Sequence, residues 1–178
     1  MKRPKCRNTL RSAFIGAVVA GTLHAPTAVA QTIGTSAAQT AGSSVVQADI
    51  QRGRYLIHIS GCNDCHTPGY PESNGTTPEK LWLTGSPLGW RGPWGTTYAS
   101  NLRLVVQNLT ETQWLRHARA EWRPPMPWFN LRAMSDADLL AIYRYVRHLG
   151  AEGKPAPAYV PPDRVAQQPY VQFPKPPK

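Results

Sequence analysis

Two thiols and one imidazole stand in the pattern C-x-x-C-H at Cys62, Cys65 and His66. Cysteines three positions apart lie about one helical turn from each other, and each thiol can add to one vinyl group of a haem. The adjoining imidazole can then bind the iron from one face. The motif therefore predicts one covalently bound haem c, attached through Cys62 and Cys65, with His66 as an iron ligand.

Two other kinds of site use the same pair of cysteines, namely a thioredoxin-like redox pair and one half of a zinc site. A redox pair is expected to open a helix after a strand, and a structural zinc site requires a second pair of ligands, usually Cys or His, downstream. No cysteine follows Cys65, and the segment before the motif, residues 49–60, has the pattern of a helix. Both observations favour haem attachment.

The first 30 residues have the pattern of a secretory signal peptide. Five basic residues occur in the first 11 positions, an apolar stretch runs from about residue 13 to 23, and Ala28-Val29-Ala30 is a cleavage signal. We expect cleavage before Gln31 and a periplasmic protein. The apolar stretch is shorter than the roughly 20 residues of a membrane span, so we expect no stable membrane span.

The net charge excludes one class of partner. The formal charge of the 178 residues is +10, with 20 Lys and Arg against ten Asp and Glu. Five of the basic residues and none of the acidic ones fall in the first 30 positions, which leaves +5 for the remainder. A nucleic-acid-binding protein concentrates its basic residues in a stripe among aromatic residues, and this chain is predicted to be exported. We therefore expect no nucleic acid partner.

Composition divides the rest of the chain into three parts. Residues 31–48 are rich in small and polar residues without a sustained period, which predicts a flexible lead-in. Residues 154–178 contain eight prolines and few aliphatic residues, which predicts an extended tail that wraps around the protein or hangs free. The domain between them, residues 49–153, has about 100 residues, a size at which a buried porphyrin would add needed apolar bulk.

Three helices are predicted to frame this domain. The first covers residues 49–60, the second covers residues 110–120 behind a capping box, and the third runs from the cap Ser135 to Gly150. Gly53 costs about 1 kcal/mol in a helix interior relative to Ala, which suggests that another helix passes close to it. We expect the first and third helices to cross there, with Gly53 near Tyr143.

The segment between the motif and the second helix has many glycines and prolines. Residues 67–108 show no convincing alternation of apolar and polar residues, so we expect loops and no sheet, with a short strand at residues 102–106 as the one candidate. The expected fold class is mostly α, with three to four helices and long ordered loops around one haem.

A second iron ligand is expected in the segment Arg123-Pro124-Pro125-Met126-Pro127-Trp128. Prolines on both sides of Met126 stiffen the chain and can hold a thioether at a set place. Met134 has another explanation, because it can pack against Leu139 as a hydrophobic staple at the start of the third helix. The remaining candidates are three histidines, each of which is weaker than Met126: His58, His117 and His148.

Haem propionates require hydrogen-bond donors, and the glycine-rich loop contains several. Arg91, Trp94 and Asn101 are the candidates for propionate binding, together with Trp90 and Tyr98. The alternative is that the indoles form a small loop core and that Arg91 is solvated.

Six blocks that carry these features occur in order between Ile50 and Gly150. They are Gly53-Arg54-Tyr55-Leu56, Gly61-Cys62-Asn63-Asp64-Cys65-His66-Thr67, Gly92-Pro93-Trp94-Gly95, Tyr98-Ala99-Ser100-Asn101-Leu102, Arg123-Pro124-Pro125-Met126-Pro127-Trp128 and Met134-Ser135-Asp136-Ala137-Asp138-Leu139. This part of the chain resembles class I type cytochrome c domains, especially the bacterial mono-haem branch related to the cytochrome subunits of membrane-linked dehydrogenases. The resemblance implies the cytochrome c helical fold, His66 and Met126 as axial ligands, and an electron-transfer role.

The expected function is that of a one-electron carrier and not of an enzyme. A thioether ligand favours ferrous iron and raises the reduction potential, and a filled sixth position leaves no place for a substrate at the iron. Its partners would be redox proteins: a dehydrogenase or quinol-oxidising complex as donor, and a cytochrome complex or oxidase as acceptor. Two alternatives to a free carrier remain open. One is a tightly bound cytochrome subunit of an oxidoreductase, and the other is a haem ligand sensor or peroxidase-like enzyme in which Met126 leaves the iron.

Overall fold

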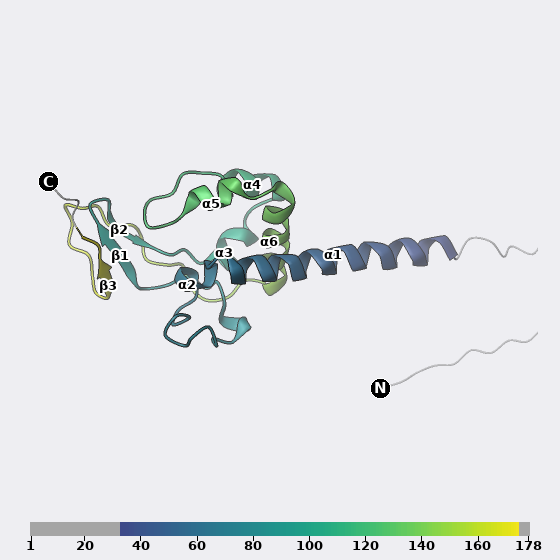
Figure 1. Cartoon of the computed structure of the whole chain (residues 1–178), viewed down its shortest axis with the longest axis horizontal. Coiled ribbons are helices and arrows are strands. Elements are labelled where there is room, and N and C mark those ends of the chain that lie inside the picture. The colour runs from purple at the N-terminus through teal and green to yellow at the C-terminus, as the bar shows by residue number, and fades with distance from the viewer. Residues whose placement is uncertain (1–32, 175–178) are drawn as a thin grey trace, which may run out of the picture.

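The structure of the chain, a computed structural model, describes residues 33–174 (Figure 1). This part contains six α-helices and a three-stranded sheet, so the fold is mixed and the prediction of no sheet is wrong. The helices are α1 (Ile33–Ile59), α2 (Cys62–His66), α3 (Leu102–Gln107), α4 (Glu111–Ala118), α5 (Trp128–Ala133) and α6 (Asp136–Leu149), with a 3₁₀ turn η1 (Glu79–Leu81). The strands are β1 (Gly89–Gly92), β2 (Gly95–Tyr98) and β3 (Tyr170–Gln172).

The predicted signal peptide, residues 1–30, lies outside the described residues. Within residues 33–174, no helix combines the length and the apolar character that crossing a membrane requires.

The crossing of α1 and α6 forms the centre of the core. A Cβ atom added to Gly53 would overlap the carbonyl group of Ala141 and would lie 2.7 Å from the Cβ atom of Tyr145. The predicted close approach at Gly53 is therefore confirmed, although its partners on α6 are Ala141 and Tyr145 and not Tyr143. Ile57 of α1 and Val146 of α6 are fully buried in the same core.

Local capping signals define two of the helices. The Thr110 side chain accepts a hydrogen bond from the amide of Gln113, and the Gln113 side chain accepts one from the amide of Thr110, which confirms the capping box of α4. The Ser135 hydroxyl accepts from the amide of Asp138 at the start of α6. Gly150, at φ 75°, ends that helix as predicted.

Helix α1 begins well before the predicted first helix. Residues 33–48 are helical, so the prediction of a flexible lead-in is wrong for this segment. The segment contains several alanines and glutamines and no proline, and these residues allow the helix of residues 49–59 to extend backwards. The side chains of residues 42–48 are exposed, and this part of α1 projects away from the rest of the molecule (Figure 1).

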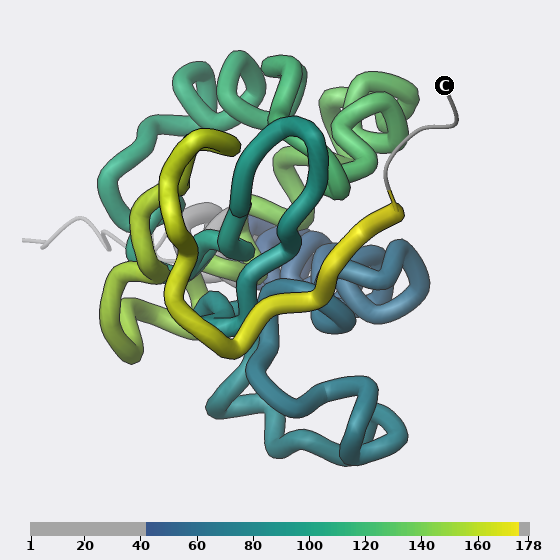
Figure 2. The backbone as a smooth tube through the Cα atoms, turned by 90° about the vertical axis from the view of Figure 1, so that its left-hand side faces the viewer, coloured from purple at the N-terminus to yellow at the C-terminus, as the bar shows by residue number. Residues whose placement is uncertain are grey.

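The sheet joins a hairpin to the C-terminal segment. Strands β1 and β2 are antiparallel, with Gly89 opposite Tyr98, and β3 pairs with β1 in parallel, with Gly89 opposite Tyr170. Figure 2 shows the C-terminal segment in yellow running alongside the hairpin. The predicted tail therefore wraps around the protein as far as it is described. The candidate strand at residues 102–106 is instead helix α3, whose first turn is capped by Asn101.

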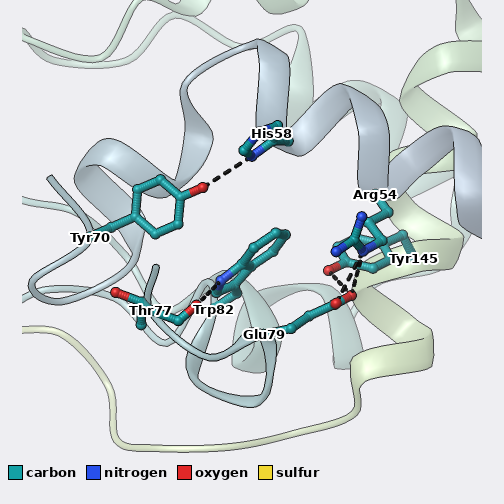
Figure 3. Close-up of polar contacts among 7 residues, drawn as sticks. All are labelled: Arg54, His58, Tyr70, Thr77, Glu79, Trp82 and Tyr145. Atoms are coloured by element: carbon teal, nitrogen blue, oxygen red, sulfur yellow. Dashed lines mark hydrogen bonds and ion pairs between the residues drawn. The ribbon is translucent and has the colours of Figure 1, made fainter. Parts of the chain in front are cut away.

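An ion pair and a hydrogen bond attach the turn η1 to the two central helices (Figure 3). Glu79 accepts from Arg54 of α1 at 3.0 Å and from the hydroxyl of Tyr145 of α6 at 2.8 Å. Burial, and secondly the bond to Glu79, raise the pKa of Tyr145, so this hydroxyl keeps its proton as a donor. The loop that follows the C-x-x-C-H motif is thus fixed to the core.

Candidate cofactor site

The C-x-x-C-H motif forms the short helix α2, which follows α1 after a sharp turn. Gly61 makes this turn at φ 69°, in the left-handed region that glycine adopts without strain. The Cys62 and Cys65 side chains are both free thiols and half-buried, and both line the same cavity as His66. The spacing of the motif therefore brings its three functional side chains to one cavity, as predicted.

The surroundings of His66 favour its neutral form and fix its tautomer. Its Nδ1 atom donates a hydrogen bond to the carbonyl oxygen of Ser100 at 2.8 Å. Burial lowers the pKa of the imidazole, which favours the neutral ring, while the Ser100 bond acts in the opposite direction. Because Nδ1 carries the proton, Nε2 carries the lone pair that can bind a metal. A backbone acceptor on the other nitrogen is the arrangement that orients metal-binding histidines.

Asn63, which lies between the two cysteines, connects α2 to the following loop through hydrogen bonds. The Asn63 side chain is buried, and its Oδ1 atom accepts from the Thr67 hydroxyl at 2.7 Å. The Thr67 hydroxyl in turn accepts from the amide of Leu83 at 2.8 Å. The Nδ2 atom of Asn63 is buried and has no hydrogen-bond partner within the described part of the chain.

The thiols do not have the properties of a redox pair. Burial raises the pKa of the Cys62 thiol to about 12 and also raises the pKa of Cys65. Thiol–disulfide exchange proceeds through a thiolate, which these environments disfavour. A structural zinc site requires four protein ligands. In residues 33–174, no group of even three His, Cys, Asp or Glu side chains lies close enough together to hold a metal ion.

The cavity beside the motif has the size and lining of a cofactor site. Its volume is about 410 Å³, within the range of roughly 300–1,000 Å³ for small-molecule and cofactor sites. The cavity is lined by residues of helices α1 to α6, of the β1–β2 hairpin and of the loop of residues 122–127, and by residues 157 and 159 of the tail. Aromatic and aliphatic side chains predominate among them, so the lining is suited to a largely apolar group that is held by a few donor atoms.

Three side chains with a suitable donor atom line this cavity besides those of the motif. Met126 lies in the irregular loop between α4 and α5, as predicted, whereas Met134 packs against the hydrophobic core. His117 is half-buried beside Trp114 and Trp122, at ring distances of 6.0 and 4.6 Å. Burial lowers the pKa of His117, which favours its neutral form.

The His58 side chain has a structural role on the other side of α1. Its Nδ1 atom lies 3.0 Å from the Tyr70 hydroxyl, and its ring stacks on Trp82 (Figure 3). The Trp82 indole donates to the carbonyl oxygen of Thr77 at 2.8 Å. His58 does not line the cavity, in agreement with its low rank as a ligand candidate.

Two of the three predicted propionate donors are engaged within the hairpin and the tail, and neither lines the cavity. The Arg91 guanidinium donates to the Thr96 hydroxyl at 3.0 Å and to the carbonyl oxygen of Arg164 at 3.3 Å. The Trp94 indole donates to the carbonyl oxygen of Trp90 at 3.3 Å. The Arg91 donors thus hold the C-terminal segment and the Trp94 donor bonds within the hairpin, and cofactor binding by either residue stays a prediction.

Asn101, the third predicted donor, also lies outside the cavity lining. Its Nδ2 atom donates to the carbonyl oxygens of Glu152 and Lys154, at 2.7 and 3.1 Å, while its Oδ1 atom caps α3. Asn101 thus has a structural role, and its predicted part in binding a cofactor stays a prediction. Trp90 and Tyr98, named with it, do line the cavity.

Sequence reasoning missed the contribution of the tail. Pro157 and Tyr159 line the cavity, and Arg123, which also lines it, lies over the ring of Tyr159 at 4.0 Å from its centroid. Neither tail residue belongs to a periodic pattern or a motif. The one available signal was the presence of two tyrosines in a proline-rich segment with few aliphatic residues.

Comparison of the chain with protein-family models, curated proteins and solved structures finds no match. The chemistry of the cavity therefore has to be inferred from its own residues. These are two thiols and one oriented, neutral imidazole on one wall, and an uncharged donor atom in the loop of residues 122–127.

Proposed function

We propose that this protein is a one-electron carrier that holds one c-type haem in the cavity. Cys62 and Cys65 are the attachment points, and His66 Nε2 is the iron ligand. The observation that carries the proposal is the bond from His66 Nδ1 to the Ser100 carbonyl, on a ring that shares its cavity with both thiols. When bound, the haem supplies a reversible one-electron couple.

Met126 is proposed as the second axial ligand. It lines the cavity from an irregular loop, where a methionine gains little from core packing, whereas Met134 already packs against the core. The His117 ring is held between two indoles. A soft sulfur ligand stabilises ferrous iron, so the carrier would have a higher reduction potential than a protein with two imidazole ligands.

A carrier role is favoured over the two alternatives by the arrangement of the chain. With His66 and Met126 on the iron, no coordination position is left for a substrate, which disfavours a sensor or a peroxidase-like enzyme. The tail packs on the hairpin of its own chain, which disfavours a role as the attachment element of a larger oxidoreductase. The sequence resemblance to class I type cytochrome c domains supports the same function.

The proposed cellular setting follows from the predicted signal peptide. An exported carrier would exchange electrons in the periplasm with a dehydrogenase or a quinol-oxidising complex on one side and a cytochrome complex or oxidase on the other. Fractionation of cells that express the full chain tests this setting, because the processed protein should appear with the periplasmic fraction and begin at Gln31.

The central experiment is expression of the full chain together with a c-type cytochrome attachment system. We expect the denatured protein to stay coloured after extraction with acidified solvent, and its mass to exceed that of the polypeptide by one haem. The double variant Cys62→Ala/Cys65→Ala serves as the control and should lose the colour. A wild-type protein that has the mass of the bare polypeptide would contradict the proposal.

A further inference from the structure

We infer that the C-terminal segment, residues 154–174, is a strap that holds the loop of residues 123–127 in place, and that Tyr159 is the positioning residue at their contact. The strap runs along the hairpin on the side shown in Figure 2. The inference deepens the proposed function, because this loop carries Met126, but the contact itself can be tested without any cofactor.

The middle of the strap is bound to β2. Thr96 and Val160 form an antiparallel bridge, in which the Thr96 amide donates to the Val160 carbonyl oxygen at 2.7 Å and the Val160 amide donates to the Thr96 carbonyl oxygen at 3.0 Å. The neighbouring Tyr159 hydroxyl donates to the carbonyl oxygen of Trp94 at 2.7 Å. A Cβ atom added to Gly95 would lie 2.8 Å from the Tyr159 ring. Tyr159 is therefore held in a fixed position against the hairpin.

Both ends of the strap are also attached. At its start, Asn101 donates to the carbonyl oxygens of Glu152 and Lys154. At its end, β3 pairs with β1, and the amide of Phe173 donates to the Arg91 carbonyl oxygen at 2.7 Å. The strap is therefore attached at its start, middle and end, and provides a fixed surface for other segments.

The Met126 loop is held between the strap and the hairpin. The Arg123 guanidinium lies over the Tyr159 ring, 4.0 Å from its centroid, which is the geometry of a cation–π contact. On the other side, the Thr97 hydroxyl of β2 donates to the carbonyl oxygen of Pro124 at 2.7 Å. These two contacts are made three and two positions before Met126 in the chain.

The loop has few bonds of its own. The Met126 amide donates to the Arg123 carbonyl oxygen at 3.3 Å, and the Trp128 amide donates to the Met126 carbonyl oxygen at 2.9 Å. These bonds join residues within or next to the loop and do not fix it to the rest of the protein. The position of Met126 at the cavity therefore depends on Tyr159 and Thr97.

The test compares three single variants of the full chain, Tyr159→Leu, Tyr159→Phe and Tyr55→Leu. Tyr159→Leu removes both the ring under Arg123 and the hydroxyl, whereas Tyr159→Phe keeps the ring. Tyr55→Leu is the matched control, because Tyr55 is exposed on α1, where its ring also lies under an arginine, Arg52. The first readout is hydrogen exchange at the amides of Met126 and Trp128.

We expect exchange of both amides to be about tenfold faster in Tyr159→Leu and unchanged in Tyr55→Leu, with Tyr159→Phe between them. In haem-loaded protein, Tyr159→Leu should also bind carbon monoxide faster than the wild type. When the pH is raised, the ferric sulfur-to-iron band should disappear at a lower pH in Tyr159→Leu than in the wild type. These changes are expected because Met126 leaves the iron more often.

Exchange rates in Tyr159→Leu within twofold of the wild type would overturn the inference. If Tyr159→Leu fails to fold, Arg123→Gln replaces it, since this change removes the cation from an exposed position without altering the strap. Failure of haem attachment in the wild type would contradict the proposed function and would leave the exchange measurement as the test of the strap. The two failures are thus distinguishable.

Discussion

Gly53 of α1 lies directly against the backbone of Ala141 in α6. An added Cβ atom would stand 2.6 Å from the Ala141 carbonyl carbon, closer than side chains approach backbone atoms. This contact fixes the crossing of the two central helices, and α1 leads directly into the turn before Cys62. The position of the C-x-x-C-H motif at the cavity therefore depends on one glycine that does not line the cavity.

The substitution Gly53→Ala is expected to destabilise the protein by about 2–3 kcal/mol, because the methyl group forces two helix backbones apart. Urea unfolding measures the effect. Gly42→Ala is the matched control, since Gly42 lies in the same helix with nothing within 4 Å of an added Cβ atom. Alanine should stabilise the helix there by up to about 1 kcal/mol. Equal effects at the two positions would show that the crossing is looser than described.

The axial ligand is tested by comparing Met126→Ala with Met134→Leu and His117→Phe in haem-loaded protein. We expect the ferric far-red sulfur-to-iron band to disappear only in Met126→Ala, and the reduction potential to fall in the same variant because the thioether that favours ferrous iron is lost. If the band disappears in Met134→Leu instead, the ligand assignment is wrong. If the sulfur-to-iron band is retained in all three variants, neither methionine is the axial ligand.

Arg103 is a buried cation whose donors bind only backbone oxygens. It donates to the carbonyl oxygens of Gly150 and Lys80, both at 2.6 Å, and also to that of Leu149. Arg103→Met should cost about 2–3 kcal/mol of stability, because the end of α6 loses its donors. Thermal unfolding checks this value. Arg116→Met, at an exposed position on α4, should change stability by less than about 0.5 kcal/mol.

The Arg52–Asp138 pair predicts a pH dependence in acid. The bond from Arg52 and, to a smaller extent, the bond with Ser135 hold the pKa of Asp138 below its ordinary value of 3.8. The contribution of the ionised Asp138 carboxylate to stability is therefore fully present above pH 3.8. It is lost as the pH falls through the lower pKa that this group has in the folded protein. Asp138→Asn should cost less than about 1 kcal/mol at neutral pH and nothing in strong acid.

Urea unfolding of both proteins at several pH values measures this difference. The same substitution made in an Arg52→Gln background is the control, and the pH-dependent part should be smaller there. A difference between Asp138→Asn and the wild type that stays constant from neutral pH into strong acid would contradict the assignment.

Local signals explain which elements could be predicted. Helix α6 has a capping serine, acidic residues in its first turn and a terminal glycine within one short stretch, and α4 has a capping box. Helix α5 has six residues, too few to show a helical period. The sheet pairs residues 89–92 with residues 170–172, and no local pattern reports a contact between segments so far apart in the chain.

The same distinction applies to the site. Cys62, Cys65 and His66 could be placed together because their spacing alone brings them to one helix. Arg91 and Asn101 could be recognised as donors, but their partners are largely backbone carbonyls, which every residue has. Side-chain type therefore could not distinguish a donor to a bound cofactor from a donor to the tail.

The place of the C-terminal segment in the chain has a consequence for how the cavity is completed. Pro157 and Tyr159 form one wall of the cavity, and they are synthesised after every other residue that lines it. A group that entered the cavity before this segment had folded would therefore meet a more open pocket. Packing of the C-terminal segment on the hairpin would then complete the wall.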